Sequence, residues 1–312
     1  QFKKMLNQHS SRVLFTSTDV LLVLLVLIWG ANFSVVKVVV AEMPSLAFNA
    51  IRILTACFVL VAISRLKGES VPERRDWPHF ARLGFLGYFL YQILFVTGLE
   101  KTTVTNSSLI LGCMPFAVIA LNAISGQRES FDWRQWIGFV LATVGVGFVV
   151  GQGGEADFET FTGDAMIFVA LWAWAFYTSG SRRLLDRYSP LQVSTYATVV
   201  GALLFTPVAV PTLIDLQWTH ISVSAWVLTV LSGVFALSVS HIIWYTGVQR
   251  LGSARTSVYS NVVPVVAMFI AGVWLLEPIG VVRVGGAAIV LTGLLLTRVE
   301  PRKTSHKNNF EV

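Results

Sequence analysis

Long apolar stretches separated by short polar connections run through almost the whole chain. Ten of them reach the roughly 20 residues that a helix needs to cross the hydrocarbon core of a bilayer. They lie at about 19–40, 46–64, 79–98, 104–124, 134–151, 163–180, 191–210, 223–247, 254–275 and 281–298. Backbone groups in lipid must bond within their own segment, so helices are expected rather than strands. The pattern predicts an all-α membrane protein with ten transmembrane helices.

The sequence contains an internal repeat, in which the first half of the chain matches the second half. Residues 97–101 (TGLEK) match 246–250 (TGVQR), and Pro115 matches Pro264 at the same spacing. Five spans per half is an odd number, so the second half must enter the membrane from the opposite side. The repeat therefore predicts two inverted five-helix units, an arrangement found in alternating-access carriers.

The spans and the repeat together predict the domain organisation. Gln1–Lys4 precede Met5, the expected natural start, and are interpreted as an expression remnant within the N-terminal tail. The expected units are a cytoplasmic tail at 1–18, a first repeat at 19–151, an acidic external linker at 152–162, a second repeat at 163–298 and a cytoplasmic tail at 299–312.

Charge changes this picture only by fixing an orientation. Charged residues make up 13% of the chain, against about 25% in soluble domains, and mean hydropathy is +0.68. The net charge of +6 is spread over short connections, so no nucleic-acid partner is expected. Nineteen of the 23 basic residues fall on the predicted side of the termini, and only Lys101 and Arg283 fall in connections on the other side. The bias predicts cytoplasmic termini in a bacterial inner (plasma) membrane.

Motifs for catalysis are absent from the sequence. No phosphate-binding glycine loop, metal-ligand spacing or nucleophile elbow is present, so we expect no enzyme activity, no cofactor and no metal. Cys57 and Cys113 lie inside predicted helices and are interpreted as packing thiols. The expected partners are a small-molecule substrate and the lipid bilayer, and the pattern leaves monomer and homodimer open.

Polar and aromatic side chains inside the helices are the candidates for substrate binding. They share faces of the third and eighth helices, and of the first and sixth, where Trp29 and Phe33 match Trp172 and Phe176 at a spacing of 143. The candidates are Trp29, Phe33, Tyr88, Tyr91, Gln92, Phe95, Trp172, Phe176, His241, Trp244, Tyr245 and Tyr259. Each ring alone fits an interface belt or simple packing equally well. The convergence of both halves favours a cavity.

Two basic residues and two prolines inside the spans have alternative interpretations. Lys37 and Arg52 either extend toward the membrane interface or face an aqueous vestibule that attracts an anionic group such as a carboxylate. Pro115 and Pro264 form either static kinks or hinges.

These residues resemble those of the drug/metabolite transporter superfamily, and in particular of its ten-helix EamA-type exporters. The resemblance rests on 29–33 (WGANF), on 106–108 (NSS) with Pro115, and on 257–261 (SVYSN) with Pro264. It implies a central cavity from helices one, three, four, six, eight and nine, with helices five and ten behind. It also implies export of small metabolites, and the aromatic amino acid exporters are the closest functional analogy.

The predicted function is therefore a secondary transporter that exports small amphipathic metabolites, with amino acids, aromatic ones among them, as leading substrates. The alternatives are a nucleotide-sugar or drug carrier, or a non-transporting membrane receptor or scaffold. Only His241 can titrate near mid-depth, so an obligatory proton gradient is not expected.

Overall fold

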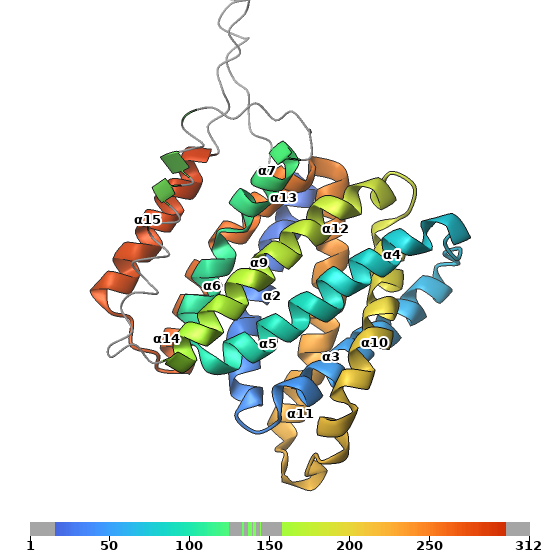
Figure 1. The fold of residues 1–312 in the computed structure, drawn as a ribbon, viewed down its shortest axis with the longest axis horizontal. Coiled ribbons are helices and arrows are strands. Elements are labelled where there is room, and N and C mark those ends of the chain that lie inside the picture. The colour runs from blue at the N-terminus through green and yellow to red at the C-terminus, as the bar shows by residue number, and fades with distance from the viewer. Residues whose placement is uncertain are drawn as a thin grey trace, which may run out of the picture.

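The computed structural model describes residues 16–124, 133, 137–138, 140–141, 144 and 158–297. The regular elements of this part of the chain are all helices, gathered in one bundle (Figure 1). The α-helices are α2 (Ser17–Val40), α3 (Ser45–Leu66), α4 (Trp77–Leu83), α5 (Tyr91–Lys101), α6 (Val104–Gly112), α7 (Met114–Ile124), α9 (Phe158–Leu185), α10 (Pro190–Ile214), α11 (Val223–Leu231), α12 (Ser240–Leu251), α13 (Ser253–Tyr259), α14 (Val263–Trp274) and α15 (Val281–Thr297). Three 3-10 helices, η1 (Arg74–Asp76), η3 (Trp218–His220) and η5 (Ser260–Val262), and two π-helices, η2 (Gly84–Leu90) and η4 (Ser232–Val239), complete them.

Eight helices in the described residues are long and apolar enough to cross a membrane. They are Ser17–Val40, Ser45–Leu66, Arg74–Lys101, Val104–Ile124, Phe158–Leu185, Pro190–Ile214, Val223–Leu251 and Ser253–Trp274. The predicted span 134–151 falls where only isolated positions are described. The predicted span 281–298 appears as α15, whose 17 residues are at the lower limit for a crossing. The all-helical prediction is confirmed here, and eight of the ten predicted crossings are present.

Polar side chains set the starts of several helices. Thr16 and Asp19 form a capping box at the start of α2, and Ser189 and Gln192 form another at α10. α9 begins at Phe158, earlier than the predicted start at residue 163, so the last residues of the predicted external linker are helical. An acidic residue, Glu159, in the first turn of α9 favours this early start through the helix dipole.

The two halves of the sequence motif lie at opposite ends of the bundle. The Lys37 amine donates to the Leu99 carbonyl at 3.0 Å, which places the end of α5 beside the end of α2. The Arg250 guanidinium donates to the Thr18 hydroxyl at 3.2 Å, which places the end of α12 beside the start of α2. The end at which α2 begins is termed the basic end, after Arg65, Lys67, Arg74, Arg75, Arg182, Arg183, Arg187, Arg250 and Arg255. The other is termed the far end.

A π-helix interrupts the same position in each half. η2 lies in the third span and η4 in the eighth, and their first residues, Gly84 and Ser232, are 148 positions apart. Each is followed by a regular helix, α5 or α12, that carries candidate binding residues. π-Helices are rare and costly, and they occur often at functional sites. Their repetition indicates a shared role.

The fourth and ninth spans are broken in the middle. α6 ends at Gly112 and α7 begins at Met114, so Pro115 is the second residue of a new helix. The 3-10 helix η5 likewise precedes α14, in which Pro264 is the second residue. Proline is tolerated in a first turn because its missing N–H would have no helical partner there. The predicted kinks are therefore breaks between helices.

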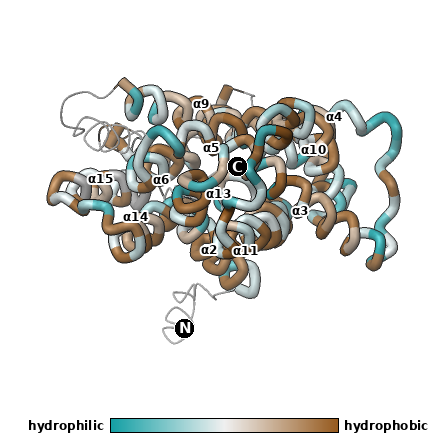
Figure 2. The backbone as a smooth tube through the Cα atoms, turned by 90° about the horizontal axis from the view of Figure 1, so that it is seen from below, coloured by the Kyte–Doolittle hydropathy of each residue, from teal (hydrophilic) through white to brown (hydrophobic). Residues whose placement is uncertain are grey.

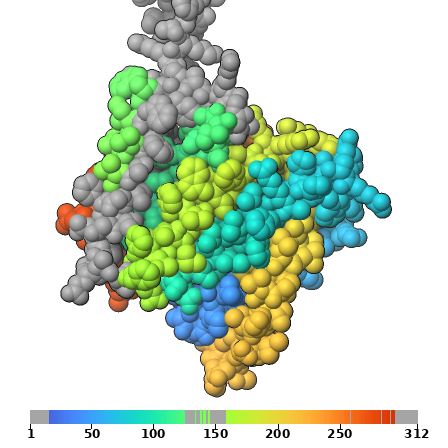
Figure 3. All heavy atoms as spheres, viewed as in Figure 1, coloured from blue at the N-terminus to red at the C-terminus, as the bar shows by residue number. Residues whose placement is uncertain are grey.

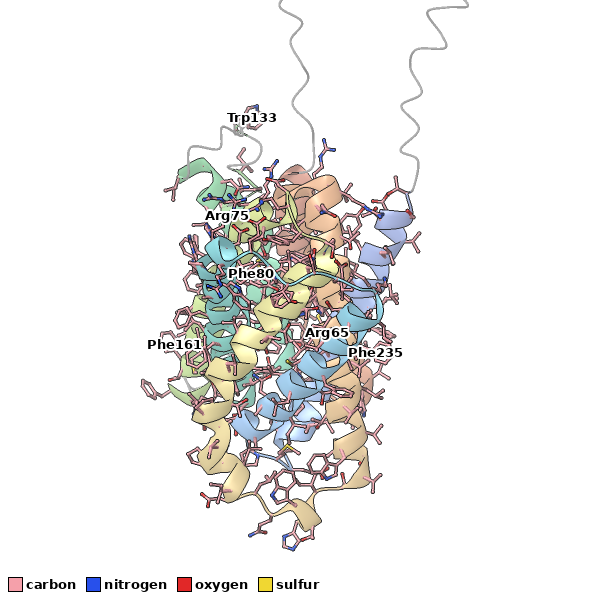
Figure 4. All side chains as sticks on the ribbon, turned by 90° about the vertical axis from the view of Figure 1, so that its right-hand side faces the viewer. Arg65, Arg75, Phe80, Trp133, Phe161 and Phe235 are labelled. Carbon is pink, nitrogen blue, oxygen red and sulfur yellow. The ribbon has the colours of Figure 1, made fainter. Side chains whose placement is uncertain are left out.

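Apolar packing holds the bundle and also covers its outside. α9 packs against α5, and α10 packs against α3 and η2. Figure 3 shows α9, α5 and α10 side by side across one face. α15 stands at one edge and packs on α6 and η5 (Figure 1). Large apolar side chains, Phe161 and Phe235 among them, point outward from the flanks (Figure 4). Hydrophilic residues gather in connections such as that between α3 and α4 (Figure 2). An apolar exterior suits a lipid environment.

Candidate functional site: a central cavity

A cavity lies in the middle of the bundle and has a volume of about 600 Å³, including the space at its opening. Both halves of the chain line it. The lining residues are Trp29, Asn32, Phe33, Arg52, Tyr91, Gln92, Phe95, Ser108, Leu111, Gly112, Met114, Trp174, Ala236, Leu237, His241, Ser260 and Val263.

Five aromatic rings form the walls of the cavity. Trp174 lies at the centre, with its ring 5.5 Å from that of Trp29 and 4.7 Å from that of Tyr91. Tyr91 stacks on Phe95 at 5.5 Å with 7° between the planes, and Phe95 meets Phe33 edge to face at 5.4 Å. Rings held by one another keep their orientation, and their faces suit a flat or apolar solute.

Few polar groups interrupt this wall. Arg52, Gln92 and His241 line the cavity and are each at most 2% exposed. His241 is surrounded by rings, with that of Tyr88 at 5.0 Å and that of Trp174 at 5.3 Å. The Gln92 carbonyl oxygen has no hydrogen-bond partner among the described residues. A buried polar atom without a partner is costly, so this oxygen is available to a solute.

Half of the candidate residues line the cavity, and three others form a layer behind it. Trp29, Phe33, Tyr91, Gln92, Phe95 and His241 are in the lining. Tyr88, Trp244 and Tyr245 are fully buried just behind, with the Trp244 ring 5.2 Å from that of Trp29. Tyr259 lies elsewhere, and its hydroxyl donates to Asp19 at the basic end.

The sixth span presents a different face from the one expected. Trp172 is only partly buried and outside the lining, and Phe176 is 41% exposed on the outer surface. Trp174, which the sequence analysis did not single out, occupies the cavity instead and is 3% exposed. Two residues correspond to about 200° around a helix, which reverses its face. The 143-residue alignment matched residue types but chose the wrong face.

Lys37 lies outside the cavity lining and closes a helix end. Its amine donates to the carbonyl oxygens of Leu99 and Glu100 at 3.0 Å each, and to that of Thr102 at 2.6 Å. Two of these carbonyls lie in the last turn of α5 and the third belongs to the residue that follows it, where a nearby cation satisfies the free carbonyls of a helix C-terminus. The position assigns Lys37 to the packing of α2 against α5.

Hydrogen bonds tie the two halves together at the basic end. Arg187 binds Glu73 at 2.8 Å and also binds Asp76, which accepts from Tyr188 as well. Ser189 donates to Glu69 at 2.7 Å. These contacts join the start of α10 to the connection between α3 and α4.

A second set of bonds ties the halves at the far end. Asp164 of α9 accepts from the Thr102 hydroxyl at 2.6 Å and from the Asn106 amide at 3.1 Å. The Glu42 carboxylate accepts from the backbone N–H of Ser222 at 2.9 Å, and this bond holds the pKa of Glu42 below its usual value. The cavity therefore lies between two layers of contacts that join the halves.

A third far-end contact connects the last part of the chain to the start of α6. The Glu277 carboxylate accepts from the Val104 backbone N–H at 2.9 Å and from the Thr105 hydroxyl at 2.9 Å. An acidic group at a helix N-terminus satisfies otherwise free N–H groups.

Comparison with known proteins identifies the two halves as copies of one domain. Residues 16–151 and 161–299 each match the model of the EamA-like transporter family. The uncharacterized transporter YyaM of Bacillus subtilis (strain 168) is 29% identical over 271 residues, which are 85% of this chain and 88% of that protein. A probable terminal-alkyne amino-acid exporter of Streptantibioticus cattleyicolor is 28% identical and covers 89% of this chain and 92% of its own length.

A solved structure has the same fold. This crystal structure of another protein superposes on the present chain with a TM-score of 0.70 at 16% sequence identity, and the match covers 91% of this chain and 99% of that chain.

Proposed function

We propose that this chain, which belongs to the EamA-like transporter family, exports small amphipathic metabolites. The chain is a multi-pass membrane transporter of the drug/metabolite transporter superfamily and not an enzyme. Amino acids, aromatic ones among them, are the leading substrate class. The observation that carries the proposal is the central cavity, which both halves line with aromatic rings and a few polar groups. The exporter from Streptantibioticus cattleyicolor, named for an amino acid, supports the same class.

The two layers of contacts suggest how the cavity opens alternately. In an inverted repeat, one half rocks against the other around a fixed site. The bonds of Arg187 and Ser189 would break when the basic end opens, and those of Asp164, Glu42 and Glu277 when the far end opens. Because each layer joins the halves directly, breaking one while keeping the other exposes the cavity to one side of the membrane.

The proposed orientation places both termini in the cytoplasm of a bacterium, with the basic end inward. The support is the excess of Lys and Arg in connections at that end. Single cysteines in a Cys57/Cys113-free background test it with a membrane-impermeant thiol reagent. Labelling from outside near Glu42 is expected, and labelling from outside near Arg74 would reverse the orientation.

Counterflow in proteoliposomes tests transport itself. Vesicles loaded with unlabelled amino acids should take up a labelled amino acid transiently, whereas vesicles without protein should not. Uptake of nucleotide sugars or cationic drugs but not of amino acids would favour the alternative carriers. Absence of flux for every solute tested, with folded and inserted protein, would favour a receptor or scaffold.

A further inference from the structure

Arg52 carries the one fixed charge among the described residues that line the cavity. It lies on α3, a helix that the sequence analysis did not include in the cavity wall. Its side chain is 1% exposed, so the guanidinium is held inside the bundle rather than extended toward a membrane interface.

The protein around Arg52 orients the guanidinium without neutralising it. Nη1 donates to the Asn49 side-chain oxygen at 3.1 Å, and the guanidinium carbon lies 4.9 Å from the centre of the Phe48 ring. Nε has no hydrogen-bond partner. The ion pairs found in the described part of the chain are Arg75–Glu73, Lys101–Glu159, Arg187–Glu73 and Arg187–Asp76. A buried charge without a counter-ion is unfavourable, and an anionic ligand would relieve it.

The groups around the same cavity suit the rest of an amino acid. The free carbonyl oxygen of Gln92 can accept a hydrogen bond from an ammonium group. The faces of Trp29 and Trp174 can also attract a cation, and they can stack on an apolar side chain. A positive group, a free acceptor and apolar walls thus occupy one cavity.

We propose that the cavity binds a solute with a single carboxylate, which Arg52 holds through two parallel hydrogen bonds while the aromatic wall holds its apolar part. Planar guanidinium geometry matches a carboxylate, and such charge-assisted pairs are the strong ones. The inference rests on the proposed function and narrows its substrate class to monoanionic and zwitterionic metabolites. One fixed positive charge balances one carboxylate, whereas a diphosphate, as in a nucleotide sugar, would leave negative charge uncompensated in a cavity lined largely by aromatic rings.

Matched probes test the requirement for a carboxylate. L-Phenylalanine, its amide and 3-phenylpropionate share a ring, but the amide lacks the carboxylate and the propionate lacks the ammonium. Counterflow and quenching of tryptophan fluorescence are measured for each probe, and for leucine with its amide, with reconstituted full-length protein. We expect phenylalanine and 3-phenylpropionate to bind at least about 30-fold more tightly than phenylalanine amide, and leucine to bind at least about 30-fold more tightly than its amide.

Variants of α3 assign the preference to Arg52. Arg52→Gln should lose the preference for acids over amides, and Arg52→Lys, which keeps the charge but not the paired geometry, should restore part of it. Arg65→Gln is the matched control, since Arg65 lies on the same helix, is exposed and is seen in Figure 4. It should keep the wild-type preference. Monodispersity in detergent shows that each variant is folded.

The outcomes separate this inference from the proposed function. If the wild type moves amides as well as acids, or if folded Arg52→Gln keeps the preference, the carboxylate assignment is wrong while transport stands. If the wild type moves no probe of any charge, both proposals fail.

Discussion

Gly112 lies against the ring of Pro264, so the breaks in the fourth and ninth spans meet beside the cavity. A Cβ atom at Gly112 would approach Cγ of Pro264 to 2.7 Å, closer than real carbon atoms come. Gly112 itself lines the cavity. The two half-helices therefore touch at a point where only glycine fits.

Gly112→Ala should destabilise the protein by about 1–3 kcal/mol, because the ring of Pro264 is rigid and cannot yield. Thermal unfolding in detergent measures the loss. Gly180→Ala is the control, since a Cβ there would meet only Leu83 at 3.7 Å, an ordinary contact. Equal melting temperatures for the two variants would contradict the close approach.

Trp174→Ala should lower binding and flux about tenfold, since the ring contacts Trp29 and Tyr91, and aromatic pairs contribute about 0.5–1.5 kcal/mol each. Phe176→Ala, on the outer face of the same helix, should change neither by more than about twofold. Half-saturation in counterflow is the measurement. A larger effect of Phe176→Ala than of Trp174→Ala would support the helix face expected from the sequence.

This helix also shows where inference from the sequence stops. Apolar length predicted the eight spans found in the described residues to within about five residues, because a bilayer requires such a length of any crossing helix. The face that a helix turns inward depends on its neighbours, and Trp172, Trp174 and Phe176 are all large and apolar. Nothing in the local pattern separates them.

The inward faces of the third and eighth spans were predicted better, because those faces carry polar residues. Gln92 and His241 are polar, and burial of polar groups away from a cavity is costly, so they marked the inward face correctly. Lys37 and Arg52 had equivalent interpretations from sequence. Only tertiary packing separates them. Lys37 is surrounded by three carbonyls and caps a helix, whereas Arg52 lines the cavity and is in none of the ion pairs of the described residues.

Lys37→Met should lower stability by about 1–3 kcal/mol and leave the preference for acids over amides unchanged. The loss follows from three carbonyls at the end of α5 that would lose a charged donor. Lys101→Met provides the control, since Lys101 forms an exposed ion pair with Glu159 and should change stability by less than about 1 kcal/mol. A change in substrate preference for the Lys37 variant would instead support the interpretation that Lys37 faces an aqueous vestibule.

Deletion of Phe85 tests the π-helix η2. A π-helix holds more residues per turn than an α-helix, so loss of one residue can convert it to α-helix without turning the residues that follow. We expect binding to persist and flux to fall at least about tenfold, about 1.4 kcal/mol in the barrier, if the paired π-helices let the halves rock. Deletion of Leu203 in α10, which is α-helical at that position, is the control and should destabilise the fold by rotating the rest of that helix. Full flux in the Phe85 deletion would remove η2 from the mechanism.

The buried titratable groups also indicate whether transport is coupled to a proton gradient. His241 lies among rings with no acidic partner in the described ion pairs. Asp164 is a second buried titratable group and lies in α9 at the far end. Both of its hydrogen-bond donors, Thr102 and Asn106, are neutral, so this contact between the halves involves no second titratable group.

We therefore expect downhill flux and counterflow to proceed without a proton gradient. Asp164→Asn should retain them, because rotation of the Asn106 amide would present its free oxygen to the new amide. His241→Gln should alter half-saturation and leave the insensitivity to a protonophore unchanged. Accumulation against a gradient that collapses with a protonophore in the wild type, and is lost in either variant, would instead make that residue the site of proton coupling.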